Sequence, residues 1–133
     1  LVEFVRAASS SEEEFQNSLA SMHEALDKAA EKVRQKTPAQ KDLIGQVDAL
    51  IDTLYFTYGS FALMGVDPER IFDIVHEANM GKVFPDGKAH FDPITHKILK
   101  PDDWDEKYAP EPAIRKELQR QLKAYERHKE RNK

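Results

Sequence analysis

The stretch from Leu43 to Met64 constrains the fold more than any other part of the chain. Apolar side chains recur there at spacings of three and four residues, which is the pattern of one helix face. These residues are Leu43, Val47, Leu50, Leu54, Tyr58 and Phe61. Because Phe56 and Leu63 place apolar groups on the far side as well, the helix is apolar nearly all round. Such a helix is usually buried, so we expect it at the centre of a domain.

Two carboxylates interrupt this apolar pattern. Asp48 and Asp52 are one turn apart on the same side of the predicted helix. Carboxylates are almost never fully buried unless they are paired or bound to a metal. The pair is therefore the first candidate for a functional site.

Length and composition limit the class of protein. The chain has 133 residues and no cysteine, which predicts one domain over residues 1–133 and fits a reducing cytoplasm. The net charge of −4 argues against general binding to nucleic acids, which requires a basic surface. No stretch of about twenty apolar residues predicts a membrane span, and the first residues do not resemble a signal peptide.

The rest of the chain predicts an all-α bundle of four to five helices. Serines followed by acids mark one helix start, because a serine N-cap and early acids favour a helix N-terminus. Thr37-Pro38 is expected to end that helix, with Pro38 starting the central one, and Gly65 to cap the central helix. The other expected helices are a short turn at 1–8, a helix from the serines at 9–11 to Lys36, one from Asp67-Pro68 to about 79–81, and one at about 113–131.

Residues 82–112 have no helical period and contain several prolines. A long irregular loop in a small domain is uncommon and often functional. Within it, His90–Asp92 and Lys97–Leu99 are predicted to pair as a small hairpin.

A second acidic set lies on the helix before Lys36. Glu24, Asp27 and Glu31 share one face, away from its apolar stripe. They are either an ordinary solvent-exposed side of the helix or a group that meets Asp48 and Asp52. In the second case the converging carboxylates would suit Mg²⁺, or Mn²⁺, which prefers oxygen ligands.

Asn79, Lys82 and Lys88 are candidates for substrate binding. The pattern of the third helix places Asn79 on its inward side, and a buried Asn needs hydrogen-bond partners. Lysines on the following loop suit phosphate binding, although each alone is more typical of a solvated surface. His90 and His96 are interpreted as surface residues.

Several of these segments together resemble the all-α nucleoside triphosphate pyrophosphohydrolases, in particular the MazG-like and phosphoribosyl-ATP pyrophosphohydrolase-like branch. The resemblance covers about residues 20–112. The segments that carry it are Asp48–Gly59, Met64–Pro68, Val75–Lys82, Asp86–Lys88 and Lys100–Trp104.

The resemblance implies a Glu-Glu-x-x-Glu motif on one helix and a Glu-x-x-Asp motif on the next, both binding Mg²⁺. In this chain Glu24 and Asp27 match acids of the first motif, and Asp52 matches the last acid of the second. His23 and Ala49 stand where the family has acids, and Asp48 is next to Ala49. The implied ligands are thus Glu24, Asp27, Asp48 and Asp52.

The resemblance implies hydrolysis of a nucleotide between its α and β phosphates, giving a monophosphate and pyrophosphate. Glu24, Asp27 and Glu31 are the expected catalytic acids, and Asn79, Lys82 and Lys88 the nucleotide-binding residues. The replacements at His23 and Ala49 leave an alternative open, which is an inactive helical dimer that binds a nucleotide or a protein partner. A homodimer or a higher homo-oligomer is expected in both cases, because the apolar excess of the central helix needs a partner.

Overall fold

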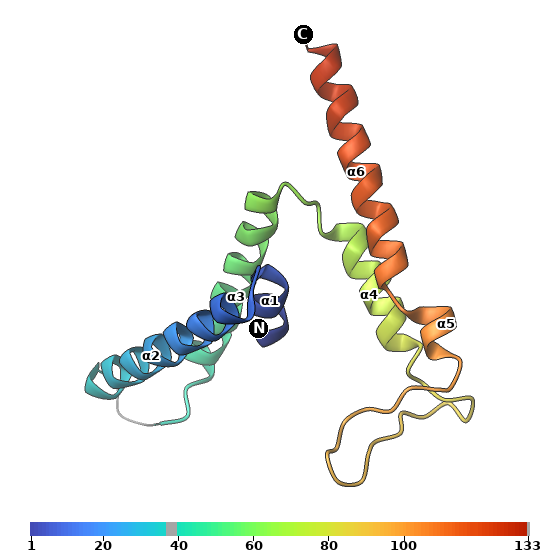
Figure 1. Cartoon of the computed structure of the whole chain (residues 1–133). Coiled ribbons are helices and arrows are strands. Elements are labelled where there is room, and N and C mark those ends of the chain that lie inside the picture. The colour runs from blue at the N-terminus through green and yellow to red at the C-terminus, as the bar shows by residue number, and fades with distance from the viewer. Residues whose placement is uncertain (37–39, 133) are drawn as a thin grey trace. The chain divides into compact units, whose positions relative to one another are not determined.

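Helices make up the regular secondary structure of the computed structural model, which describes residues 1–36 and 40–132. This confirms the predicted all-α class. The helices are α1 (Val2–Ala8), α2 (Glu12–Lys36), α3 (Leu43–Met64), α4 (Glu69–Met80), α5 (Trp104–Tyr108) and α6 (Glu111–Arg131) (Figure 1). The short helix α5 lies inside the segment predicted to be irregular and was not expected from the sequence.

The chain divides into two compact units, Leu1–Gln46 and Val47–Lys133, and each is described by itself. In the first unit α1 packs against the beginning of α2. Arg6 pairs with Glu12 at 2.8 Å and also lies over the ring of Phe15. The prediction of one domain stays a prediction.

The start of α2 is the serine-and-acid cap that the sequence predicts. The hydroxyl of Ser11 accepts a hydrogen bond from the amide of Glu14, and the Glu14 carboxylate accepts one from the amide of Ser10. The bonds from Ser10 to this carboxylate lower the pKa of Glu14. This reciprocal arrangement satisfies amides that a helix start leaves without partners.

The structure places both ends of α3. The expected break at Thr37-Pro38 lies outside the described residues, but α3 begins at Leu43, so the expectation of a helix running on from Pro38 is wrong. The prediction of Gly65 as the cap is confirmed. Gly65 has a φ of +67°, and the amides of Gly65 and Val66 bond to the carbonyls of Ala62 and Phe61, which is a Schellman cap.

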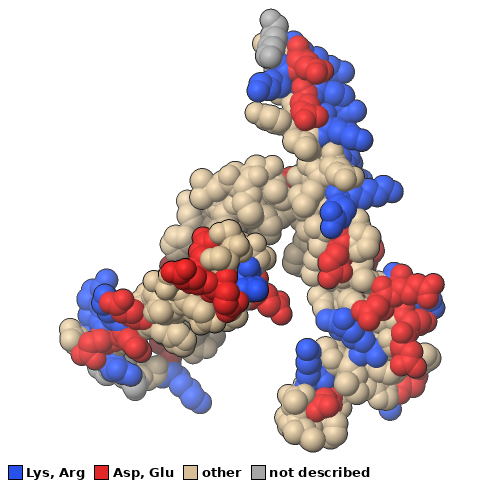
Figure 2. All heavy atoms as spheres, in the orientation of Figure 1, with Lys and Arg blue, Asp and Glu red and all other residues tan. Residues whose placement is uncertain are grey.

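The expected burial of α3 is wrong for the described chain. No residue of this helix is buried, and Leu54 in its middle is 53 % exposed. The physical reason is that α4, the next helix in the unit, packs along α6 and not along α3. Figure 2 shows that the surface over the second half of α3 carries no charged side chains, in agreement with the sequence from Thr53 to Met64.

The second unit is held together by the pairing of α4 with α6. Helix α4 begins at Glu69, one residue later than predicted, and the carboxylate of Asp67 accepts a hydrogen bond from the Glu69 amide. Helix α6 begins at Glu111, slightly before the predicted start. Among the described residues of this unit, Ala78, Trp104 and Glu117 are buried.

The loop between α4 and α5 consists of two small successive turns. Isolated antiparallel bridges join Val83 to Ala89 and Phe91 to Ile98, and the second one confirms the predicted hairpin. At the first turn Gly87 has a φ of +76°, a conformation that glycine adopts without strain. The loop is therefore ordered by local pairing.

No single helix among the described residues is long and apolar enough to cross a membrane. Helices α3 and α4 together meet the criterion of length and composition, but they are bent by 119° at their junction.

Candidate functional site

The acidic face predicted on α2 is present and open to solvent. Glu24 pairs with Lys28 at 2.5 Å, one turn away. Glu31 pairs with Arg34 and also accepts a hydrogen bond from Gln35. Asp27 is exposed on the same face. The ion pairs of this face are exposed, and such pairs contribute only about 0–1 kcal/mol to folding, so they do not close the face to a cation.

The two aspartates of α3 are also exposed. Asp48 and Asp52 lie one turn apart, on a helix that the sequence predicts at the centre of a domain. That expectation fails for the same reason as the burial of α3 as a whole. Asp48 and Asp52 belong to the second unit and Glu24 and Asp27 to the first, so the structure describes each pair in its own unit.

The donor chemistry of both pairs fits a hard divalent cation. Each pair offers two carboxylates on adjacent turns, and Mg²⁺ is typically bound through one or two carboxylates together with waters and phosphates. Within the described residues, no group of three or more Asp, Glu or His side chains is placed to hold a metal.

Asn79 and Lys82 lie together at the end of α4. Both were predicted from the sequence to bind substrate. The Lys82 ammonium donates a hydrogen bond to Asn79 Oδ1 at 2.7 Å. Asn79 is exposed rather than buried, so the expectation that it faces inward is wrong. The reason is that α6 packs on another side of α4, where Ala78 is the buried residue.

Lys88 lies on the first turn of the loop. Its amide donates to Asp86 Oδ1, and its carbonyl accepts from the amide of Phe84. His90 is exposed and pairs with Asp86 at 2.8 Å, which lowers the pKa of Asp86. His96 is exposed as well, so both histidines are surface residues, as interpreted from the sequence.

The sequence reasoning gave no role to Trp104, which the structure places at the end of α4. Its ring is 6 % exposed, and its indole N–H donates a hydrogen bond to the carbonyl of Ala78 at 2.8 Å. The neighbouring α5 packs the ring of Tyr108 against Gly81 so closely that a Cβ atom there would lie 2.6 Å from Tyr108 Cδ2. A useful signal was present in the sequence, because this is the one tryptophan of the chain.

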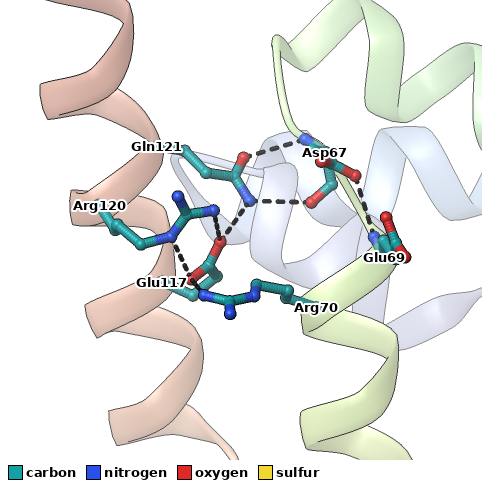
Figure 3. A network of polar contacts seen from close by, with 6 residues as sticks. All are labelled: Asp67, Glu69, Arg70, Glu117, Arg120 and Gln121. Atoms are coloured by element: carbon teal, nitrogen blue, oxygen red, sulfur yellow. Dashed lines mark hydrogen bonds and ion pairs between the residues drawn. The ribbon is translucent and has the colours of Figure 1, made fainter.

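A polar network that the sequence reasoning also missed fixes α4 on α6 (Figure 3). Glu117, 7 % exposed, accepts hydrogen bonds from Arg120 at 2.6 and 2.8 Å and from Gln121 at 3.0 Å. Arg70 of α4 is 3.9 Å from the same carboxylate. Gln121 in turn bonds to both backbone groups of Asp67. The hydrogen bonds from Arg120 and Gln121 lower the pKa of Glu117 to about 2.

Comparison with known proteins identifies two relationships. Residues 1–79 match the phosphoribosyl-ATP pyrophosphohydrolase family. Among solved structures, the chain is similar to a crystal structure from Exiguobacterium sp. 255-15 of a protein assigned as an NTP pyrophosphohydrolase. The two are 39 % identical with a TM-score of 0.81, and the match covers 94 % of this chain and 74 % of the other. A comparison with curated proteins found no match.

Proposed function

Because the chain belongs to the phosphoribosyl-ATP pyrophosphohydrolase family, we propose that it hydrolyses a nucleoside triphosphate between the α and β phosphates, giving a monophosphate and pyrophosphate. The observation that carries this proposal is the pattern of carboxylates on α2 and α3. All of them lie within the residues that match the family. Both pairs are exposed, on adjacent turns of their helices, and open to a cation and a substrate.

We assign metal binding to four carboxylates, two from each helix: Glu24, Asp27, Asp48 and Asp52. When bound there, Mg²⁺ or Mn²⁺ would lower the pKa of a water molecule and offset the charge of the phosphates. Helices that present inward carboxylates are a common way to build such sites. The exposed pair of Glu24 with Lys28 would have to open, at a small cost for an exposed pair.

Acids of α2 and residues at the end of α4 would act on the substrate. Glu31 or Glu24 accepts the proton of the attacking water, a role that carboxylates fill when they lie within hydrogen-bond reach. Asn79 and Lys82, joined at 2.7 Å, bind the nucleotide, and Lys88 adds a positive charge. Positive charges near the leaving pyrophosphate stabilise the charge that develops on it.

We further propose that the protein acts as a homodimer in which a second copy covers α3. The hydroxyls of Thr53, Thr57 and Ser60 all donate to carbonyls four residues earlier in the same helix, at 2.7 to 2.9 Å. Covering this surface would therefore leave none of these hydroxyls without a partner. Large exposed apolar surfaces are typical of protein interfaces.

The alternative is a dimer that binds a nucleotide or a protein partner and does not hydrolyse. His23 and Ala49, in place of two family acids, favour this alternative. Pyrophosphate release from a panel of nucleoside triphosphates with and without Mg²⁺ separates the two. Release that requires Mg²⁺ supports hydrolysis, and binding without any release supports the alternative.

The sharpest test of the proposed site is Asp52→Asn, which removes a negative ligand and keeps the size of the side chain. We expect turnover to fall by at least about a hundredfold, because a catalytic metal supplies several kcal/mol. The melting temperature without metal should stay unchanged, because Asp52 is exposed. Asp73→Asn is the control, since Asp73 is an exposed aspartate of α4. Parental turnover in Asp52→Asn would remove Asp52 from the site.

A further inference from the structure

The indole ring of Trp104 lies below two lysines from different segments. Lys100 Nζ is 3.7 Å from the ring centroid, and Lys82 Nζ is 5.8 Å from it. The two ammonium groups are thus no farther apart than the sum of these distances. A cation over the face of a tryptophan is attracted by the ring quadrupole, so the ring gathers two positive charges in one place.

The ring itself is fixed by the end of α4. The last four carbonyls of this helix each accept a hydrogen bond. Three of these bonds come from the backbone amides of Gly81, Lys82 and Val83, and the indole of Trp104 supplies the bond to Ala78. Because these carbonyls are already bonded, the lysines do not have to donate hydrogen bonds to them. The two ammonium groups are still attracted to the negative end of the helix.

The two lysines are held only weakly by their present polar partners. Lys100 is 3.3 Å from Asp105, whose side chain is 82 % exposed. Such an exposed ion pair contributes little to stability. Lys82 is bonded to the neutral amide of Asn79. Both ammonium groups can therefore exchange their present partners for an anion that carries several charges.

We propose that Lys100 and Lys82 together bind the phosphate chain of the substrate, and that Trp104 is the positioning residue that holds them side by side. Lys100 is one of the loop lysines that suit phosphate binding by sequence, and the structure adds its position over Trp104. The inference rests on the proposed function, because it assigns a part of the same nucleotide to this end of α4. A chain of phosphates suits the site because two separated cations can each contact a different phosphate group.

The test uses the fluorescence of Trp104, which as the one tryptophan of the chain reports this place alone. The probe is inorganic tripolyphosphate, which has no base or sugar. We expect a saturable change in fluorescence as the anion binds to the two ammonium groups that lie over the ring. Lys100→Gln should weaken this binding by about tenfold or more, as expected for the loss of a charged hydrogen bond.

Two variants control for general charge and for folding. Lys97→Gln makes the same charge change on the same loop, at an exposed residue, and should bind as the parent does. Asp105→Asn removes the competing carboxylate and should bind the probe more tightly. Because Lys100 and Asp105 lie on the surface, the melting temperatures of all three variants should match the parent's. Equal binding by Lys100→Gln and Lys97→Gln, or no fluorescence response in the parent, would overturn the inference.

Kinetics keep this inference separate from the proposed function. If the parent releases pyrophosphate, Lys100→Gln should raise KM for the nucleotide severalfold more than it changes kcat, because phosphate contacts are made before and during the reaction. A parent that binds tripolyphosphate but releases no pyrophosphate contradicts the hydrolysis and leaves the anion site supported. A parent that hydrolyses, with KM unchanged in Lys100→Gln, contradicts the anion site alone.

Discussion

Helix α3 and the α4–α6 pair differ in how apolar content relates to burial. Helix α3 has the most apolar sequence in the chain, yet none of its residues is buried. Helices α4 and α6 carry far fewer apolar side chains but contain or adjoin the buried residues Ala78, Trp104 and Glu117. Burial thus follows the presence of a packing partner, and apolar content alone shows only how much surface a partner could cover.

The two regions also differ in how their polar groups are satisfied. The hydroxyls of Thr53, Thr57 and Ser60 in α3 bond within their own helix, so these three groups need no partner from a neighbour. In the α4–α6 pair, Glu117 of α6 contacts Arg70 of α4. Gln121 of α6 bonds to the backbone of Asp67, two residues before α4 begins. A buried charged group of this kind gives a unique register, while a self-satisfied apolar surface accepts whatever covers it.

The largest expected effect tests whether a second copy covers α3. In a homodimer Leu54→Ala should cost about 2–5 kcal/mol, as for a buried leucine, and it should shift the protein toward a 15.3 kDa monomer. Sedimentation and chemical unfolding measure the two effects. Ile94→Ala, at a loop residue that is 87 % exposed, is the control and should change neither. If the parental protein sediments as a monomer at micromolar concentration, no second copy covers α3 and the prediction is wrong.

A smaller effect is expected where α5 meets the end of α4. An Ala at residue 81 would contact the Tyr108 ring, and overpacking of this kind costs about 1–3 kcal/mol. Gly81 itself has an ordinary helical φ of −64°, at which replacing Gly by Ala normally stabilises by about 0.4–1 kcal/mol. Gly81→Ala should therefore destabilise the parent but be neutral or stabilising in a Tyr108→Ala background. Unfolding of the four proteins of this double-mutant cycle measures it.

Local sequence signals predicted the helices well, because a cap or a glycine acts through its own neighbours. Ser11 before three acids and Gly65 after an apolar helix each do in the structure what they were expected to do. The expected helix after Asp67 also forms, but Pro68 is its N-cap and it begins at Glu69. Pairing of Phe91 with Ile98 followed from the same local reasoning. The sequence could not predict that α4 would pack along α6 and not along α3, because this packing depends on contacts between residues far apart in the chain.

The candidate site divides in the same way. The adjacency of Asn79 and Lys82 was predictable because they are three residues apart. The position of Lys100 over Trp104 was not predictable, since it depends on how a loop of two turns returns to the end of α4. The grouping of Glu24 and Asp27 with Asp48 and Asp52 stays a prediction, because the two pairs belong to different units.

The smallest expected effect concerns Glu117, and it depends on pH. The pKa of this carboxylate is lowered in the folded protein from 4.5 to about 2. A lowered pKa means that the charged network stabilises the fold fully above about pH 4.5 and loses this contribution as the pH falls toward 2. Glu117→Gln has no such charge to lose. Its melting temperature should lie below the parent's at neutral pH, and the gap should shrink steadily on acidification.

Other carboxylates with lowered pKa values, such as Asp86 and Asp92, titrate in both proteins, so the difference between the two melting curves isolates Glu117. Glu126→Gln is the matched control, because it makes the same change at an exposed position of α6. Its difference from the parent should be small, because the side chain is exposed. A gap for Glu117→Gln that stays constant from pH 7 to pH 3 would show that the network holds α4 to α6 by shape and neutral hydrogen bonds, and not by the buried charge. In that case the contrast with the self-satisfied hydroxyls of α3 would no longer depend on electrostatics.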